Sequence, residues 1–176
     1  MNKKRLQLKI NGLREIKNVM ESMNIDYYLG GNALIGIFRN GLILPIETGI
    51  AISLKYEDYI LYCKGLVKNL VAAKFEIRMN NNKEGLKEKI KARKNNFLYE
   101  IAPWYSGEGM RIRAKYNLPE KFFTPGSRVE MQKESYQTFN TPEEYLIFRF
   151  GENWKTPIVS DKRKDYENGR YYRKLK

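Results

Sequence analysis

The stretch from residue 27 to residue 54 restricts the possible folds of this chain more than any other. It reads YYLGGNALIGIFRNGLILPIETGIAISL. A short apolar run ends at Gly30 and Gly31, and residues 32 to 39 then resume a helical spacing of apolar side chains. A proline-led connection follows, and residues 50 to 54 alternate in the manner of a strand. The stretch therefore predicts a strand, a tight turn, a helix and a second strand in close succession.

The glycine pair at the start of this helix predicts a phosphate-binding turn. A strand-to-helix turn built on Gly30 and Gly31 exposes backbone N–H groups and the positive end of a helix, and both favour an anion. We expect Asn32 to cap the helix and to bind the phosphate together with Gly30 and Gly31. Arg39 lies far enough along the helix to add a charge-assisted contact to the same anion. Taken alone, the doublet is also compatible with a tight turn that binds nothing.

The remaining patterns predict a mixed α+β domain. Helical periodicity is expected over about residues 6 to 23, 57 to 72 and 142 to 150, and strand-like patterns over 50 to 54, 75 to 79, 90 to 94, 96 to 101, 110 to 114 and 129 to 133. Thr141 is the expected cap of the last helix, with Pro142 at its first position. We expect a single domain over residues 1 to 160, followed by a basic tail over 161 to 176.

The charge balance favours an anionic partner. The chain has 33 Lys and Arg against 20 Asp and Glu, which gives a net charge of +13. A nucleotide, a phosphosugar, nucleic acid and an anionic membrane surface all fit this charge. A genome rich in A and T would enrich Lys, Asn, Ile and Tyr without any function, so the charge does not choose among these partners.

Two residue types narrow the chemistry by their scarcity. The single cysteine, Cys63, cannot form an internal disulfide, so nothing favours an oxidising compartment. The absence of histidine excludes Ser–His and Cys–His nucleophile pairs and His-ligated zinc. The basic N-terminus is not followed by the apolar run of a signal peptide, and no run of about 18 apolar residues occurs. We expect a cytoplasmic protein, with association to a membrane surface left open.

Three blocks of the chain resemble the LicD/fukutin-related group of the nucleotidyltransferase-fold superfamily. Members of this group carry a Gly-Thr-Leu-Leu-Gly-x-x-Arg helix followed by Ile-Pro-Trp-Asp-Asp-Asp-Ile-Asp, and GNALIGIFR at 31 to 39 with LPIETGIAI at 44 to 52 is similar to them. FLYEIAPWY at 97 to 105 resembles the later strand that supplies a third carboxylate. TPEEYLIFRFGENWKTP at 141 to 157 resembles the closing helix and its Tyr-Gly-x-x-Trp-x-x-Pro element.

The resemblance implies a nucleotidyltransferase-like mixed β-sheet flanked by helices. It also implies transfer of a phospho-alcohol, such as phosphocholine or ribitol phosphate, from a CDP-linked donor to a glycan acceptor. In such a site two carboxylates two residues apart on a strand, with a third from a neighbouring strand, hold Mg²⁺ or Mn²⁺ against the diphosphate.

The chain departs from the family where the metal is held. In the matching register the Asp-x-Asp pair becomes Gly49 and Ala51, and neither side chain can bind a metal. Glu47 keeps the first acidic position, and Glu100 stands at the third carboxylate. Glu47 and Glu100 are therefore the predicted catalytic and metal-binding residues, either as a pair around a single ion or with help from the acidic residues at 57 and 58.

Three further residues are candidates for substrate contacts, namely Trp104, Arg149 and Trp154. Packing in the hydrophobic core is the competing interpretation for both tryptophans. Three functions remain open on the sequence: a transferase with an altered Mg²⁺ or Mn²⁺ site, an inactive accessory subunit that binds a nucleotide or glycan without a metal, and a basic nucleic-acid-binding protein. The basic tail suits nucleic acid or a membrane, and equally a solubilising segment.

Overall fold

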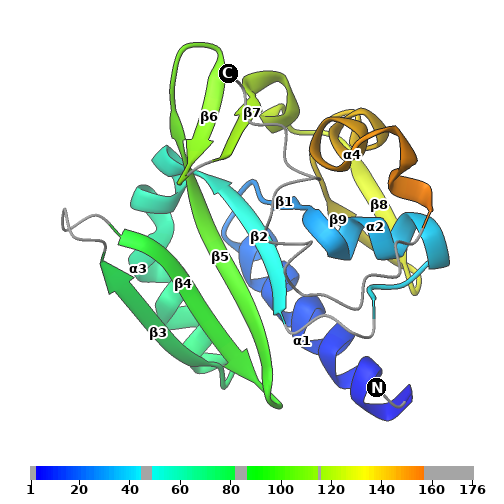
Figure 1. Cartoon of the computed structure of the whole chain (residues 1–176). Helices are drawn as coiled ribbons and strands as arrows, with labels where there is room; N and C mark the ends of the chain where they lie inside the picture. The colour runs from blue at the N-terminus through cyan, green and yellow to red at the C-terminus, as the bar shows by residue number, and fades with distance from the viewer. Residues whose placement is uncertain (1–2, 45–48, 82–86, 115, 157–176) are drawn as a thin grey trace.

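A computed structural model describes residues 3–44, 49–81, 87–114 and 116–156 (Figure 1). Its helices are α1 (Lys3–Ser22), α2 (Gly31–Asn40), α3 (Tyr56–Ala72) and α4 (Pro142–Phe150), with 3₁₀ turns η1 (Glu120–Phe123) and η2 (Glu152–Lys155). Its strands are β1 (Tyr28–Leu29), β2 (Gly49–Lys55), β3 (Glu76–Asn81), β4 (Lys87–Lys94), β5 (Phe97–Ser106), β6 (Met110–Arg113), β7 (Tyr116–Pro119), β8 (Arg128–Met131) and β9 (Glu134–Gln137). The predicted mixed α+β architecture is confirmed.

Seven strands form one mixed sheet. Its order is β1-β2-β5-β4-β3, and β6 and β7 continue from the end of β5 as a hairpin. Among the described strands of this sheet, β2 and β5 pair in parallel, with Ala51 beside Glu100, and the other strand pairs are antiparallel. Figure 1 shows α1 and α3 behind this sheet, whereas α2 and α4 lie on its other side, near β2. The face of β2 toward α2 and α4 is therefore separate from the face that covers the main core.

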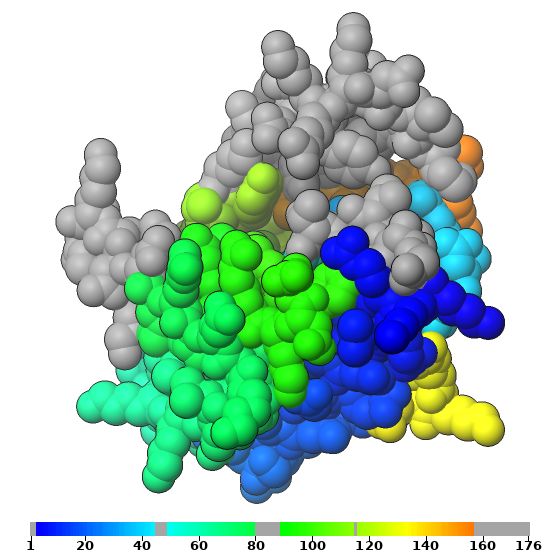
Figure 2. All heavy atoms as spheres, turned by 90° about the horizontal axis from the view of Figure 1, so that it is seen from below, coloured from blue at the N-terminus to red at the C-terminus, as the bar shows by residue number. Residues whose placement is uncertain are grey.

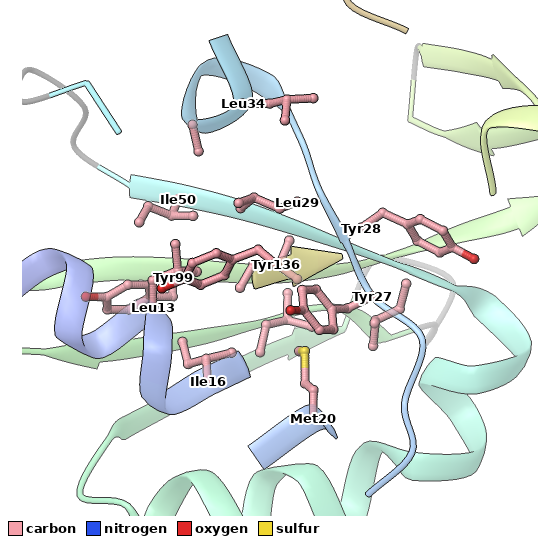
Figure 3. Close-up of a cluster of buried hydrophobic side chains, with 14 of the residues drawn as sticks. Leu13, Ile16, Met20, Tyr27, Tyr28, Leu29, Leu34, Ile50, Tyr99 and Tyr136 are labelled. Carbon is pink, nitrogen blue, oxygen red and sulfur yellow. The ribbon is translucent and has the colours of Figure 1, made fainter. Parts of the chain in front are cut away.

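The main core lies between the sheet and α1 (Figure 3). The apolar stripe of α1, which includes Leu13 and Ile16, is fully buried, as is Ile50 on the facing side of β2. Gly12 allows the close approach, because a Cβ at that position would lie 2.2 Å from the Tyr99 hydroxyl. That hydroxyl donates a hydrogen bond to the carbonyl of Lys9 at 2.8 Å. The helix and the central strand are thus locked together by packing and by one buried hydrogen bond.

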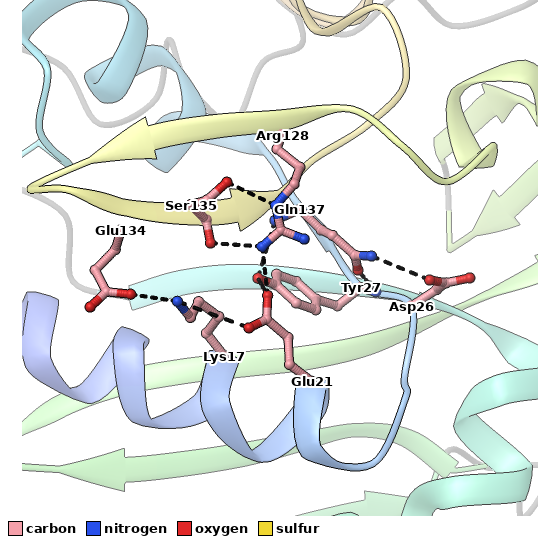
Figure 4. A network of polar contacts seen from close by, with 8 residues as sticks. All are labelled: Lys17, Glu21, Asp26, Tyr27, Arg128, Glu134, Ser135 and Gln137. Atoms are coloured by element: carbon pink, nitrogen blue, oxygen red, sulfur yellow. Dashed lines mark hydrogen bonds and ion pairs between the residues drawn. The ribbon is translucent and has the colours of Figure 1, made fainter.

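The β8–β9 hairpin is fastened to α1 by an ion-pair network (Figure 4). Lys17 Nζ donates to Glu134 of the hairpin at 2.5 Å, and Arg128 of the hairpin donates to Glu21 of the helix at 2.7 Å. Seen from below, α1 lies between the green strands of the sheet and the yellow hairpin (Figure 2). The hairpin therefore extends the fold around α1 without joining the main sheet.

Glycine also determines how α2 turns back toward the sheet. A Cβ at Gly36 would lie 2.7 Å from the backbone of both Leu42 and Leu44, so only glycine lets this segment pass across the helix. The helix ends at Asn40 and is capped by Gly41, which has a φ of 68° and donates its N–H to the carbonyl of Ile37 at 2.8 Å. This return leads the chain toward the start of β2.

The structure differs from the expectations in several local features. Gly30, with extended backbone, is the N-cap of α2, so Asn32 lies inside the first turn rather than at the cap. β5 continues through Pro103 to Ser106, and the strands β7 and β9 were not expected. The tail over 161 to 176 lies outside the described residues, so the domain boundary at 160 stays a prediction. No helix in the described ranges is long and apolar enough to cross a membrane.

Candidate functional site

A cavity of about 170 Å³ opens between the first turn of α2, strand β2 and helix α4. Its described lining consists of Gly30, Gly31, Asn32, Ala33, Gly49, Ala51, Ser53, Trp104, Arg113, Tyr145, Arg149 and Phe150. The three glycines, the two alanines and the serine make this lining small along its α2 and β2 sides. On β2 the lining residues alternate with Ile50 and Ile52 of the main core, so the cavity lies on the other face of this strand.

The glycine turn forms one rim of the cavity. A Cβ at Gly30 would lie 2.4 Å from the Phe139 ring, so the turn is packed tightly on that side. Gly31 has a φ of 59°, in the left-handed region that favours glycine, and a Cβ there would meet no atom within 4 Å. The N–H of Gly31 donates to the hydroxyl of Tyr145 on α4 at 3.1 Å. The positive end of α2 is thereby held at the cavity.

Strand β2 forms the floor with small, uncharged side chains. Gly49, Ala51 and Ser53 line the cavity, while Ile50 and Ile52 between them point into the core. Trp104 of β5 adjoins this floor, and its indole N–H donates to Ser53 Oγ at 3.0 Å. This bond fixes the ring of a buried tryptophan as part of the wall.

Two arginines supply the charge of the cavity. Arg149 of α4 lies over the ring of Tyr116, with its guanidinium carbon 4.3 Å from the ring centroid. Arg113, at the end of β6, is half-buried. Burial lowers the pKa of the Arg113 guanidinium, the charge of Arg149 acts in the same direction, and Glu100 opposes both. The described part of the lining is therefore positively charged, and both burial and the charge of Arg149 disfavour the charged form of Arg113.

Of the two predicted metal-binding residues, the structure describes Glu100. Glu100 does not line the cavity, and its carboxylate accepts a hydrogen bond from Lys89 Nζ at 2.5 Å. Glu47 lies outside the described residues. Neither Glu57 nor Asp58 lines the cavity, and Glu57 pairs with Arg111 at 2.6 Å.

The described residues do not fit a divalent cation. Mg²⁺ and Mn²⁺ prefer carboxylate oxygens, but the described lining holds two arginines and no acid. Across the described ranges, no group of three or more Cys, Asp or Glu residues is placed to hold a metal. The Glu47–Glu100 pair therefore stays a prediction that the sequence alone makes.

The other predicted residues divide into two groups. Gly30, Gly31, Asn32, Trp104 and Arg149 all line the cavity, although they come from three separate blocks of the sequence.

Arg39 and Trp154 do not line it. The Arg39 guanidinium donates to the carbonyl of Thr156 at 3.1 Å, and Trp154 packs edge-on against Phe38 with ring centroids 5.8 Å apart. The sequence did not single out Arg113 or Tyr145. Tyr145 lies in a quoted block, whereas Arg113 follows no recognisable motif.

Comparison with known proteins supports the fold alone. No family model and no curated protein sequence matches the chain. Among solved structures, the solution structure of the antibiotic-resistance factor ANT(2'')-Ia superposes with a TM-score of 0.58 at 15% identity, covering 94% of this chain and 83% of that one.

The crystal structure of ANT(2'')-Ia in complex with adenylyl-2''-tobramycin gives a TM-score of 0.54 at 14% identity, covering 94% of this chain and 86% of that one. The chain therefore has a nucleotidyltransferase-like fold, in which a mixed sheet is flanked by helices.

Proposed function

We propose that the chain binds a nucleotide through its phosphates in the cavity between α2, β2 and α4. One observation carries the proposal: the Gly30–Gly31 turn and two arginines from other elements converge on a single cavity of a nucleotidyltransferase-like fold. A helix N-terminus and guanidinium groups are both strong phosphate ligands, and here they act on the same space.

The size of the cavity favours phosphate entry over base entry. Its volume is about 170 Å³, whereas pockets that enclose a drug-sized ligand run to roughly 300–1,000 Å³. A phosphate group or a diphosphate fits such a space, while a nucleoside would extend across the Gly31 rim. We expect recognition to depend on the phosphates more than on the base.

Two sources supply the first ligands to test. The resemblance to the LicD/fukutin-related group points to CDP-linked alcohols, with a glycan as acceptor. The ANT(2'')-Ia complex contains an adenylylated compound, adenylyl-2''-tobramycin, which adds adenine nucleotides to the set. CDP-choline, CDP-ribitol and ADP therefore cover both sources.

Binding rather than transfer is the function that the described residues support. Metal-assisted phosphoryl transfer needs carboxylates that hold the ion, and β2 presents Gly49 and Ala51 at the positions where the resemblance places them. We expect turnover of CDP-choline to stay at the uncatalysed background, so the chain would act as a nucleotide-binding accessory protein.

Calorimetric titration tests the proposal directly. The full chain is titrated with CDP-choline, CDP-ribitol and ADP, and with cytidine and adenosine as phosphate-free controls. We expect heat of binding from at least one nucleotide and none from either nucleoside. Absence of binding by all three nucleotides, or equal binding of a nucleoside, would overturn the proposal.

A second candidate function, nucleic-acid binding, is favoured by a basic row on the same face of the sheet. Lys91 of β4 is the register partner of Glu100, Arg78 of β3 is the partner of Lys91, and exposed Arg93 is two residues from Lys91. Cross-strand partners project from one face, so this basic row continues the face that carries Ala51.

Titration with a single-stranded RNA separates the two candidates. A polyanion held by the basic row should lose affinity steeply with rising salt and should ignore base identity. Displacement of that RNA by CDP-choline would mean that the row and the cavity form one site.

A further inference from the structure

We infer that Arg113 and Arg149 bind the phosphates directly and take the place of a divalent cation in this cavity. The inference rests on the nucleotide binding proposed above and says how the phosphate charge is neutralised. It predicts that nucleotide binds without any metal.

Arg113 differs from its neighbour Arg111 in what surrounds it. Arg111, two residues earlier on β6, is buried and is held by two carboxylates, Glu57 and Glu120, each with an oxygen at 2.6 Å. Arg113 takes part in none of the ion pairs found among the described residues, and it lines the cavity. The strand thus carries one arginine that is fully paired by protein carboxylates and one that faces the ligand space.

Among the described residues, the carboxylate whose charge acts on Arg113 is already engaged. Glu100 attracts Arg113 through space, but its oxygen accepts a hydrogen bond from Lys89 Nζ at 2.5 Å. Arg149 and Arg113 line the same cavity, and the charge of Arg149 lowers the pKa of Arg113, so the two charges repel each other. An anion between the two guanidinium groups would remove that repulsion and would also offset the cost of burying Arg113.

The geometry of Arg149 favours a bound phosphate. Its guanidinium carbon lies 4.3 Å from the centroid of the Tyr116 ring, and this contact limits the rotamers that must be ordered on binding. A guanidinium offers a planar fork of N–H donors that matches two phosphate oxygens. Arg113 and Arg149 come from different elements, so they can approach a diphosphate from two sides.

The floor of the cavity also favours a phosphate over a metal ion. Carboxylates at residues 49 and 51 would repel a phosphate unless a cation lay between them, whereas Gly49 and Ala51 present no charge. The described lining therefore carries two positive charges and no negative one. Such a lining attracts a phosphate directly and repels Mg²⁺ or Mn²⁺. Uncharged residues at 49 and 51 and the two arginines are thus consistent with a single anion site.

The test compares nucleotide binding with and without metal. The full chain is titrated calorimetrically with CDP-choline and with ADP, first in EDTA and then in Mg²⁺. We expect the dissociation constant in EDTA to lie within about twofold of the value in Mg²⁺, because neither arginine needs a cation to bind phosphate.

Variants identify the groups responsible. Arg113→Gln should weaken nucleotide binding in EDTA by about tenfold or more, the size expected for one lost charge-assisted contact. Should Arg113→Gln fail to fold by circular dichroism, Arg113→Lys and Arg149→Lys keep the charge and remove the fork, and each should weaken binding several-fold. Lys64→Gln removes one charge from the exposed side of α3 and should leave binding unchanged.

The outcomes separate this inference from the proposed function. Binding that requires Mg²⁺, and that Glu47→Gln or Glu100→Gln abolishes, would overturn the inference and leave nucleotide binding intact. Metal-free binding that Arg113→Gln and Arg149→Lys do not weaken would also overturn it. Absence of nucleotide binding under both conditions would overturn the proposed function as well.

Discussion

Ala51 of β2 and Glu100 of β5 are partners in the parallel register, so their side chains project from the same face of the sheet. Only Glu100 carries a carboxylate, and Lys89 neutralises it. Carboxylates added to β2 at the level of Ala51 would therefore lie beside Glu100. Introducing carboxylates on β2 therefore tests whether this face of the sheet can hold a metal ion.

The double variant Gly49→Asp, Ala51→Asp should create a site for a divalent cation. Both positions accept the change, because a Cβ at Gly49 would lie 3.4 Å from the carbonyl oxygen of Leu98, an ordinary contact, and Ala51 is exposed. We expect Mn²⁺ binding, measured by electron paramagnetic resonance, where the wild type shows none. Nucleotide binding should at the same time become dependent on the metal.

A charge-matched variant controls for nonspecific attraction of Mn²⁺. Leu61 and Val71 lie on α3 with exposed fractions of 72% and 52%, so Leu61→Asp, Val71→Asp adds the same charge on the other side of the sheet. This control should bind no Mn²⁺. A folded Gly49→Asp, Ala51→Asp protein without Mn²⁺ affinity would mean that these positions do not correspond to the Asp-x-Asp pair of the LicD/fukutin-related group.

Tryptophan fluorescence should report nucleotide binding through one residue only. The chain has two tryptophans; Trp104 lines the cavity, whereas Trp154 packs against Phe38 outside it. CDP-choline should change the emission of the wild type and of Trp154→Phe by equal amounts. Trp104→Phe should show no change, although it loses the bond to Ser53 and about 1–2 kcal/mol of stability. A response that disappears in Trp154→Phe would place the ligand elsewhere.

Alanine at either glycine of the turn should destabilise the fold, for a different reason at each position. Gly30→Ala forces a Cβ to 2.4 Å from the Phe139 ring, and such overpacking costs roughly 1–3 kcal/mol of unfolding free energy. Gly31→Ala meets no atom but must hold a φ of 59°, which costs about 1–2 kcal/mol. Urea unfolding measures both losses.

Gly109 provides a matched control for Gly31. It has a φ of 65° and equally open surroundings, and it does not line the cavity. Gly109→Ala should therefore destabilise the protein by about as much as Gly31→Ala, since the backbone strain is the same. Only Gly31→Ala should also weaken CDP-choline binding. Equal binding by the two variants would show that the Gly31 rim does not contact the ligand.

The helices could be predicted from the sequence because their periodicity is local. The apolar stripe of α1 and the Thr141–Pro142 start of α4 each contain enough information within one segment. Strands β7 and β9 could not be predicted from their own residues, because each is defined by the antiparallel partner with which it pairs. The N-cap position was assigned to Asn32 because an extended Gly30 leaves no trace in the sequence.

Residues of the candidate site could be predicted from the sequence only where they lie in a recognisable motif. Gly30, Gly31 and Arg149 lie in blocks that could be recognised one by one, and the fold brings them to one cavity. Arg113 could not be singled out, because nothing local separates it from Arg111 in the sequence MRIR. The difference between the two arginines arises from tertiary contacts, namely the carboxylates of Glu57 and Glu120 around Arg111 alone.

The cluster around Arg111 should make stability depend on pH below about pH 4.5, the ordinary pKa of a glutamate. Partial burial would raise the pKa of Glu57, but hydrogen bonds from its own backbone N–H and from Arg111 outweigh burial and lower that pKa. A carboxylate whose pKa is lower in the folded state stabilises the fold at higher pH and loses this contribution as pH falls through the folded pKa. We therefore expect the free energy of unfolding to fall as the solution is acidified.

Urea unfolding between pH 3 and pH 7 measures this contribution in a double-mutant cycle. Glu57→Gln should lower the free energy of unfolding at neutral pH, by less than about 1 kcal/mol because the Glu57 side chain is 56% exposed to solvent. The free energy of unfolding of this variant should also fall less steeply as the pH is lowered. In an Arg111→Met background, Glu57→Gln should have a smaller effect, since the Arg111 contact is gone and the backbone N–H of Glu57 still lowers its pKa. A loss of stability on acidification that is unchanged in Glu57→Gln would assign the pH dependence to other carboxylates and leave the Glu57–Arg111 pair without a net contribution.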